Sequence, residues 1–321
     1  MSSPREPRVL FVGGSGHHYL RRAVTDPTRG LFVADPDAPG AAEAMAERGG
    51  FAMFDGSLAS AVDDFAPDIV SVGTVYGKAG EHVLAARQLG LPVVTDKPAA
   101  ATWEQLAALE AREAIGGPIL TEFDWRAQPA LRAAKKLVES GDFGPIVLAL
   151  AQKTYPLGNR PTWYRNRDLY GGTMLWVASH AIDALRFVCG ELTVVSAHHS
   201  NAGSPSIAPA EDIAVANFTL ASGGIAVAHA DLARPTGHGT HGDDRLVVRC
   251  AKGEIEVRGG ECIVTKAEAP KSVPLPSTPS LEHSLIAAAL GESDDDAFST
   301  DETLLTSRLL LQARDAADGE A

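Results

Sequence analysis

Cysteine and aromatic residues are scarce in this sequence of 321 residues. It contains 3 cysteines, and aromatic residues make up 6% of the chain. Cys189, Cys250 and Cys262 lie far apart and form no C-x-x-C pair, so they provide neither a disulfide framework nor a thiolate metal cage. This use of cysteine predicts a reducing, cytoplasmic location.

Positive charge and long hydrophobic runs are also in short supply. The 28 Lys+Arg against 41 Asp+Glu give a net charge of −13. Nucleic acids and anionic membranes bind clustered positive charge, so we expect neither as a partner. No apolar run approaches the roughly 18 residues that a membrane helix needs, and the polar start MSSPREP predicts no signal peptide.

The length and the hydrophobic pattern together favour two domains. Short apolar runs alternate with helical stretches in the first third of the chain, at residues 8–12, 31–34, 68–72, 91–95 and 119–122. Buried runs separated by helices are typical of parallel strands with right-handed crossovers. We therefore predict a doubly wound α/β domain of the Rossmann type over residues 1–122.

The pattern changes near residue 123. After helical stretches at 129–140 and 172–189, strands follow one another through tight turns, most clearly at 213–220 and 225–230. Residues 123–321 are therefore predicted to form a second α/β domain built on an antiparallel sheet. Ser299 and Glu302 form a capping box before a helix at about 300–316, for which packing back on the first domain is an alternative.

A glycine motif after the first strand indicates a dinucleotide site. Gly14, Ser15 and Gly16 follow that strand and are expected to open a helix, whose N–H groups and dipole suit a pyrophosphate. Asp35 comes 21 positions after Gly14, the spacing of a carboxylate that accepts from a ribose hydroxyl and repels a 2′-phosphate. NAD is therefore favoured over NADP. Because Tyr19 replaces a third glycine, a tight turn without a ligand is the alternative.

The segment Thr95-Asp96-Lys97-Pro98 resembles the Glu-Lys-Pro motif of the Gfo/Idh/MocA oxidoreductases, the family of glucose-fructose oxidoreductase and inositol dehydrogenase. The similarity continues through Ala34–Asp37, Gly144-Pro145, Gly171-Gly172 and His180-Ala181-Ile182-Asp183. It implies a Rossmann domain followed by a domain with a large, mostly antiparallel open sheet. In this family the sheet often forms the oligomer interface, which implies a homo-oligomer, either a dimer or a tetramer.

The resemblance also implies an activity, namely NAD(P)-dependent oxidation of a secondary alcohol of a sugar, cyclitol or related polyol, or reduction of the ketone. Carried over by position, His180 is the acid/base and Lys97 donates to the reacting oxygen, roles that suit an imidazole and an ammonium. A structural histidine and a surface lysine are the alternatives. The candidate cofactor residues are Gly14, Ser15, Gly16, Asp35, Thr74, Tyr76, Asp96 and Lys97.

The sequence departs from the family at Trp176, where an aspartate usually stands four residues before the histidine. Asp183 is a candidate replacement on the same helix face, and Trp176 either stacks on a sugar or belongs to the core. The segment 160–168 is rich in aromatic and guanidinium groups, which suit a polyol, or else it is a packing loop. The candidate substrate residues are Trp163, Tyr164, Arg165, Trp176 and Asp183.

Two further readings remain open, and no metal is expected. His238 and His241 lack a third ligand at convincing spacing. Because Trp176 replaces the aspartate, a catalytically silent dinucleotide-binding sensor or scaffold is the first alternative function. A hydrolase or lyase that uses NAD transiently is the second.

Overall fold

The computed structural model describes residues 6–111 and 116–319, which form two compact units. Unit 1 comprises Met1–Glu122 and Ser280–Ser307, and unit 2 comprises Phe123–Pro279 and Arg308–Ala321. The sequence assigns residues 280–307 to the second domain, whereas their contacts group them with the N-terminal part of the chain. The helix α9 (Leu281–Ala289) and the first part of α10 (Thr300–Asp318) therefore belong to unit 1.

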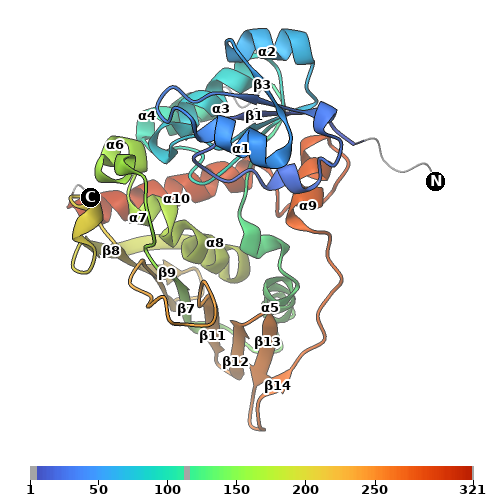
Figure 1. The fold of residues 1–321 in the computed structure, drawn as a ribbon. Helices are drawn as coiled ribbons and strands as arrows, with labels where there is room; N and C mark the ends of the chain where they lie inside the picture. Colours follow the sequence, from blue (N-terminus) through green and yellow to red (C-terminus); the bar gives the residue numbers. More distant parts are fainter. Residues whose placement is uncertain (1–5, 112–115, 320–321) are drawn as a thin grey trace. The chain divides into compact units, whose positions relative to one another are not determined.

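Unit 1 contains a six-stranded parallel sheet in the order β3-β2-β1-β4-β5-β6 (Figure 1). Its strands are β1 (Val9–Val12), β2 (Gly30–Val33), β3 (Ala52–Phe54), β4 (Ile69–Val72), β5 (Val93–Thr95) and β6 (Ile119–Thr121). All four residues of β1 and of β4 are buried, as expected for central parallel strands covered on both faces. The predicted doubly wound sheet is thereby confirmed.

The helices of unit 1 differ from the prediction directly after the glycine motif. In addition to α9 and the first part of α10, unit 1 contains α1 (Ala41–Gly49), α2 (Leu58–Phe65), α3 (Ala79–Gln88) and α4 (Trp103–Glu110). The α-helix expected directly after the glycine motif is absent from the described residues 13–29, which hold only the 3-10 turns η1 (Tyr19–Arg22) and η2 (Pro27–Arg29). The Asp26 side chain accepts from Thr28 N and Pro27 lacks an N–H, so this segment favours turns.

Unit 2 contains an eight-stranded sheet in the order β14-β13-β12-β11-β7-β10-β9-β8. The strands are β7 (Ile146–Thr154), β8 (Leu192–Ser200), β9 (Ile213–Leu220), β10 (Ile225–Asp231), β11 (Arg245–Cys250), β12 (Gly253–Arg258), β13 (Glu261–Thr265) and β14 (Lys271–Ser272). Every neighbouring pair is antiparallel except β7 and β10, which confirms the mostly antiparallel prediction.

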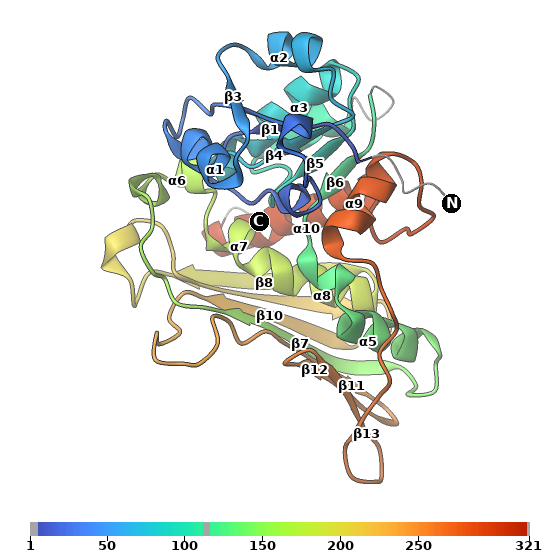
Figure 2. The same ribbon diagram turned by 45° about the vertical axis from the view of Figure 1, so that its right-hand side comes forward.

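One face of this sheet is covered by α5 (Pro129–Glu139) and α8 (Ala178–Cys189) (Figure 2). Small side chains such as Ala149, Ala226 and Ala228 point to these helices and are buried, which lets the helices lie close to the strands. Two shorter helices, α6 (Arg167–Tyr170) and α7 (Thr173–Trp176), precede α8. Within the described residues, no helix is long and apolar enough to span a bilayer.

Candidate active site

Lys97 follows β5 and is paired with the residue before it. Lys97 Nζ lies 2.9 Å from Asp96 Oδ1 and 3.3 Å from His17 Nδ1. Both side chains of the Asp96–Lys97 pair are almost completely buried. Burial alone would raise the pKa of Asp96, but the positive charges of Lys97 and His17 hold it below its usual value. Asp96 and Lys97 therefore form a buried ion pair at the carboxyl end of the sheet.

The segment from Gly13 to Tyr19, here called the glycine loop, lies across the carboxyl ends of the strands. Gly16 N donates to Gly73 O at 2.8 Å, and His17 N donates to Asp96 Oδ2 at 2.7 Å. Tyr19 N donates to Glu122 Oε1 at 2.8 Å. Three N–H groups of this loop thus bond to the protein itself.

Glu122 has an unusual environment beside that loop. It is fully buried, and burial together with the negative charge of Asp96 raises the pKa of Glu122 well above its usual value. The environment of Glu122 therefore favours its neutral form, whereas that of Asp96 favours its charged form. Both carboxyl groups accept from N–H groups of the glycine loop.

Asp35 is placed at the end of β2 as predicted, but its carboxylate faces the protein. Oδ1 accepts from Asp37 N at 2.9 Å, and Oδ2 accepts from Val75 N at 3.0 Å. Asp35 is 1% exposed, and Thr74 and Tyr76 on the neighbouring loop are buried as well. Both carboxylate oxygens of Asp35 thus accept from backbone N–H groups, and its contact with a ribose stays a prediction.

The two glycines of the motif lie close to other parts of the protein. A Cβ at Gly14 would lie 2.4 Å from Ala41 O, and a Cβ at Gly16 would lie 2.7 Å from Asp96 Oδ2. Both glycines thus allow close approach of the protein to itself. Their contact with a dinucleotide stays a prediction.

His180 lies in the first turn of α8 in unit 2 and contacts a carboxylate that the sequence analysis missed. His180 Nδ1 is 2.9 Å from Asp124 Oδ1. Asp124 begins the 3-10 turn η4 (Asp124–Ala127) and is partly exposed, whereas His180 is buried. An imidazole beside a carboxylate is an arrangement suited to moving a proton.

Asp183, the candidate replacement for the family aspartate, and Trp176, which stands at the position of that aspartate, both occupy structural positions. Arg126 Nε lies 3.0 Å and 2.9 Å from the two carboxylate oxygens of Asp183, and both side chains are buried. Trp176 is 4% exposed, and its carbonyl oxygen accepts from Ser179 Oγ at 2.6 Å. Asp183 therefore neutralises a buried arginine, and the Trp176 ring lies in the core.

The aromatic segment before α6 is largely packed. Tyr164 is buried and stacks on Tyr170 with ring centroids 4.3 Å apart. The ring centroids of Trp163 and Tyr164 are 4.5 Å apart. Arg165 Nε donates to Ser206 O at 2.7 Å. The structure therefore gives Tyr164 a packing role, and it leaves Trp163 and Arg165 as candidates without a defined ligand site.

A cavity of about 520 Å³ lies within unit 2. Its lining includes Trp125, Arg234, Arg245, Arg258, Asp243 and Asp244. Trp125 Nε1 donates to Asp244 Oδ2 at 3.0 Å, and Arg245 Nη2 lies 2.6 Å from Asp243 Oδ2. Donors, acceptors and one aromatic ring together suit a polyhydroxy compound. Trp125 directly follows Asp124 on η4, so the same turn supports the cavity and the histidine contact.

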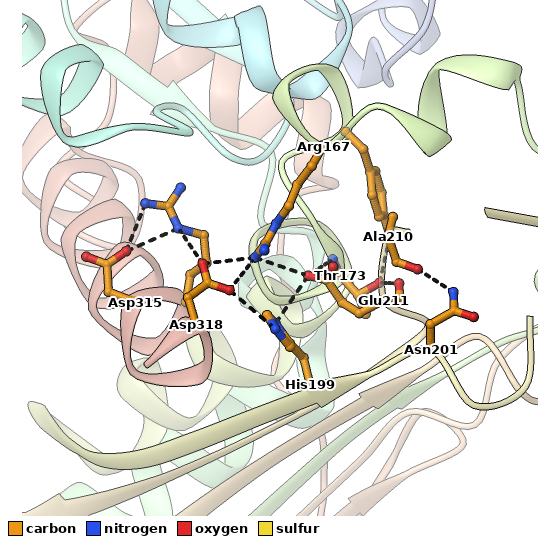
Figure 3. A network of polar contacts seen from close by, with 10 residues as sticks. Arg167, Thr173, His199, Asn201, Ala210, Glu211, Asp315 and Asp318 are labelled. Carbon is orange, nitrogen blue, oxygen red and sulfur yellow. Dashed lines mark hydrogen bonds and ion pairs between the residues drawn. The ribbon is translucent and has the colours of Figure 1, made fainter. Parts of the chain in front are cut away.

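A second group of charges in unit 2 has a structural role (Figure 3). Arg167 Nη2 and His199 Nε2 lie 2.8 Å and 3.3 Å from Asp318 Oδ1, near the end of α10. Buried Glu211 accepts from Thr173 N at 3.0 Å, which fixes the start of α7. This network joins α6, α7, β8 and α10. Neither here nor elsewhere in the described part of the chain could a group of three or more His, Cys, Asp or Glu side chains hold a metal ion.

A six-stranded parallel sheet, a mostly antiparallel second sheet and Asp-Lys-Pro after β5 define an oxidoreductase of the Rossmann type. Residues 8–121 match the oxidoreductase family with an NAD-binding Rossmann fold, and residues 131–256 match the GFO/IDH/MocA C-terminal domain. The chain belongs to the Gfo/Idh/MocA family.

Curated relatives include sugar and inositol dehydrogenases. Levoglucosan dehydrogenase of Pseudarthrobacter phenanthrenivorans is 30% identical over 171 residues, which are 51% of this chain and 44% of that protein. The scyllo-inositol 2-dehydrogenase (NAD(+)) of Bacillus subtilis is 25% identical over 72% of this chain and 68% of that protein. The chain thus spans less than half of the first relative and about two thirds of the second.

Solved structures extend the similarity over nearly the whole chain. A Thermotoga maritima protein is 27% identical, with a TM-score of 0.88 and 98% of both chains covered. Levoglucosan dehydrogenase in complex with NADH and L-sorbose has a TM-score of 0.78 at 20% identity, covering 98% of this chain and 97% of that one. The latter likeness supports the fold alone.

Proposed function

We propose that the protein is an NAD(P)-dependent oxidoreductase that interconverts a secondary alcohol and the ketone of a sugar, cyclitol or related polyol. One observation carries this proposal: the lysine of the family motif is present as Lys97, buried and ion-paired with Asp96 at the carboxyl end of β5. Ligands bind at this edge of open α/β sheets. The named activities of the curated relatives support the same class of reaction.

The proposed roles follow from the chemistry of each side chain. An alcohol is oxidised readily only when its hydroxyl proton is removed, and the imidazole of His180 is the acid/base for that proton. The ammonium of Lys97 donates a hydrogen bond to the oxygen as it gains negative charge. Asp96 keeps this ammonium in place, since it accepts from Lys97 Nζ.

Gly14, Ser15 and Gly16 would hold the pyrophosphate of the dinucleotide and Asp35 its ribose, once the glycine loop moves from its closed arrangement against Asp96 and Glu122. NAD remains the proposed dinucleotide, because a 2′-phosphate close to Asp35 would be repelled. The cavity beside η4 is the proposed location for part of the substrate. Trp163 and Arg165 are secondary candidates for its recognition.

The assembly and location of the protein are proposed on separate grounds. The sheet face of unit 2 opposite α5 and α8, here called the open face, carries Leu150, Ile225, Val227 and Val247. Ile225 is 53% exposed. A homo-oligomer, a dimer or tetramer, formed through this face would bury these side chains.

All three cysteines are free thiols, which suits the cytoplasm.

The experiment is a panel of polyols, cyclitols and sugars with NAD⁺ or NADP⁺, and of keto-sugars with NADH, followed by absorbance of the reduced nicotinamide. Turnover of at least one polyol that is lost on Lys97→Met is expected. Tight NAD binding without turnover across a broad panel would contradict the proposal.

Tight NAD binding without turnover would favour a catalytically silent dinucleotide-binding protein, such as a sensor or scaffold. The specific observation behind this alternative is the closed glycine loop, which bonds to Gly73, Asp96 and Glu122. A sensor would couple opening of the loop to dinucleotide binding and not to chemistry.

A further inference from the structure

We propose that Asp124 is a positioning residue for His180, in place of the aspartate that the family carries where this chain has Trp176. The inference concerns the same histidine as the proposed function and rests on that function only for its catalytic consequence. Its structural part concerns the imidazole itself: Asp124 selects the tautomer in which Nδ1 carries the proton.

The contact that carries the proposal lies wholly within unit 2. Asp124 Oδ1 is 2.9 Å from His180 Nδ1, and the His180 side chain is 8% exposed. The two atoms form a close charge contact and not an aligned hydrogen bond. An ionised carboxylate at this distance repels a lone pair and attracts an N–H, so it favours the tautomer that has its proton on Nδ1. The other ring nitrogen, Nε2, then keeps the lone pair that a base needs.

The backbone of η4 holds Asp124 in this position. Phe123 and Trp125, on either side of Asp124, are each 4% exposed, so the turn is anchored by two buried aromatic rings. Trp125 Nε1 also donates to Asp244 Oδ2 at 3.0 Å. Asp124 is therefore the partly exposed residue between two fixed neighbours.

A second ion pair ties the same two elements together. Arg126 on η4 contacts Asp183 on α8. Arg126 lies two residues after Asp124, and Asp183 lies three residues after His180. The charges of Arg126 and Asp183 balance one another in the core. With Asp183 engaged in this way, Asp124 is the carboxylate available to orient the imidazole.

Trp176 cannot perform this role. Its ring carries only an N–H donor and no acceptor, so it cannot stabilise a proton on His180 Nδ1. Residue 124 precedes the helix by more than 50 positions, so the replacement comes from a different element from the one that carries the family aspartate. The carboxylate that is missing at position 176 is thus supplied from position 124.

The test is the ¹⁵N spectrum of the histidine ring, recorded on the full-length protein without substrate. Long-range ¹H–¹⁵N correlations distinguish the two neutral tautomers, and His180→Gln identifies the His180 signals. We expect the Nδ1–H tautomer in the wild type and a shift to Nε2–H in Asp124→Ala and Asp124→Asn. The exposed Asp142→Ala is the matched control and is expected to leave the spectrum of His180 unchanged.

Two results would overturn the proposal. One is an Nε2–H tautomer of His180 in the wild type, and the other is an unchanged tautomer in a folded Asp124 variant. Asp124→Asn retains the size of the side chain, so it gives a folded protein to measure if Asp124→Ala does not. Neither result depends on finding a substrate, so this test can fail or succeed independently of the proposed activity.

The catalytic consequence is measured on the substrate found by the panel. We expect kcat/KM of Asp124→Ala to fall by about 10²- to 10⁴-fold, the range for loss of acid–base assistance, with little change in the unfolding midpoint. Added formate should recover part of the loss, because it supplies a carboxylate to the vacated position. A folded variant with unchanged kcat/KM would contradict the positioning role.

Discussion

Lys97 Nζ lies 2.9 Å from Asp96 Oδ1, with both side chains nearly excluded from solvent. The family lysine is thus half of a buried ion pair as well as a proposed hydrogen-bond donor. Removing one partner of such a pair leaves an uncompensated charge, whereas removing both often costs little. The pair therefore gives a way to separate stability from catalysis.

We expect Lys97→Met to abolish turnover and to lower the free energy of unfolding by about 3 kcal/mol, because Asp96 loses its partner in the interior. The double variant Asp96→Asn/Lys97→Met should recover most of the stability but none of the turnover. Chemical denaturation and steady-state kinetics on the same preparations measure both effects. Retained turnover in Lys97→Met would refute the role of Lys97.

His17 provides a test of the closed glycine loop. Its Nδ1 lies 3.2 Å from Asp96 Oδ2, and its side chain is 51% exposed. His17→Ala removes a contact that favours the closed loop, so apparent NAD affinity should rise by about 2- to 5-fold as the open form becomes more populated. Isothermal titration calorimetry measures this change. His82→Ala, in unit 1 but outside the loop, should have no effect, and equal affinities for wild type and His17→Ala would argue against loop closure as a barrier.

His18 makes the stability of the protein depend on pH. Burial lowers the pKa of His18 from 6.5 to about 4, and the ring is held between Ser71 Oγ and Gly13 O. Because the unfolded chain binds the proton more readily than the folded protein does, stability should fall as the pH drops from 6.5 to about 4. The loss attributable to His18 is about 3 kcal/mol. Unfolding curves at several pH values for the wild type and His18→Gln measure it, and identical pH dependence in both would contradict the assignment.

The pair Arg126–Asp183 should matter for stability and not for substrate affinity. Asp183→Asn leaves the buried guanidinium without its counter-charge, so we expect a loss of about 3–5 kcal/mol. KM should remain close to that of the wild type. A raised KM with unchanged unfolding free energy would instead restore Asp183 as a substrate residue.

The open face predicts the assembly. Val227 pairs with Leu150 across β10 and β7, in the middle of the apolar side chains on this face. Val227→Lys should convert the oligomer to a monomer, because a buried ammonium opposes association. Analytical ultracentrifugation measures the mass, and Asn159→Lys in an exposed loop is the charge-matched control. A wild-type monomer would rule out this interface.

Much of the fold follows from local patterns, because buried strands need apolar runs. Residues 8–12 and 68–72 were predicted and correspond to β1 and β4. The edge strand β3 (Ala52–Phe54) was missed, since its apolar run is short and two of its three residues are exposed, unlike the buried runs used for the prediction. The helix after the glycine motif was wrong because Asp26 and Pro27 favour turns over the family's usual helix.

The candidate site was predictable only where the family motif fixes positions. Lys97 and His180 could be named from neighbouring residues in the sequence. Asp124 could not, because its contact with His180 joins residues from two different elements. The sequence Phe123-Asp124-Trp125-Arg126 offers a weak signal in retrospect, namely two charges between aromatic residues at the start of the second unit.

The sharing of α10 between the units affects the order in which the protein can be completed during synthesis. Thr300 and Thr303 accept hydrogen bonds from the N–H groups of Ile119 and Thr121 on β6, an edge of the six-stranded sheet. Until the ribosome has translated the last part of the chain, that edge lacks these partners and stays open to pairing with other strands. The N-terminal unit is thus begun first but completed only when Ser280–Ser307 have been translated, and a nonsense mutation before Thr300 would damage the unit that begins the chain.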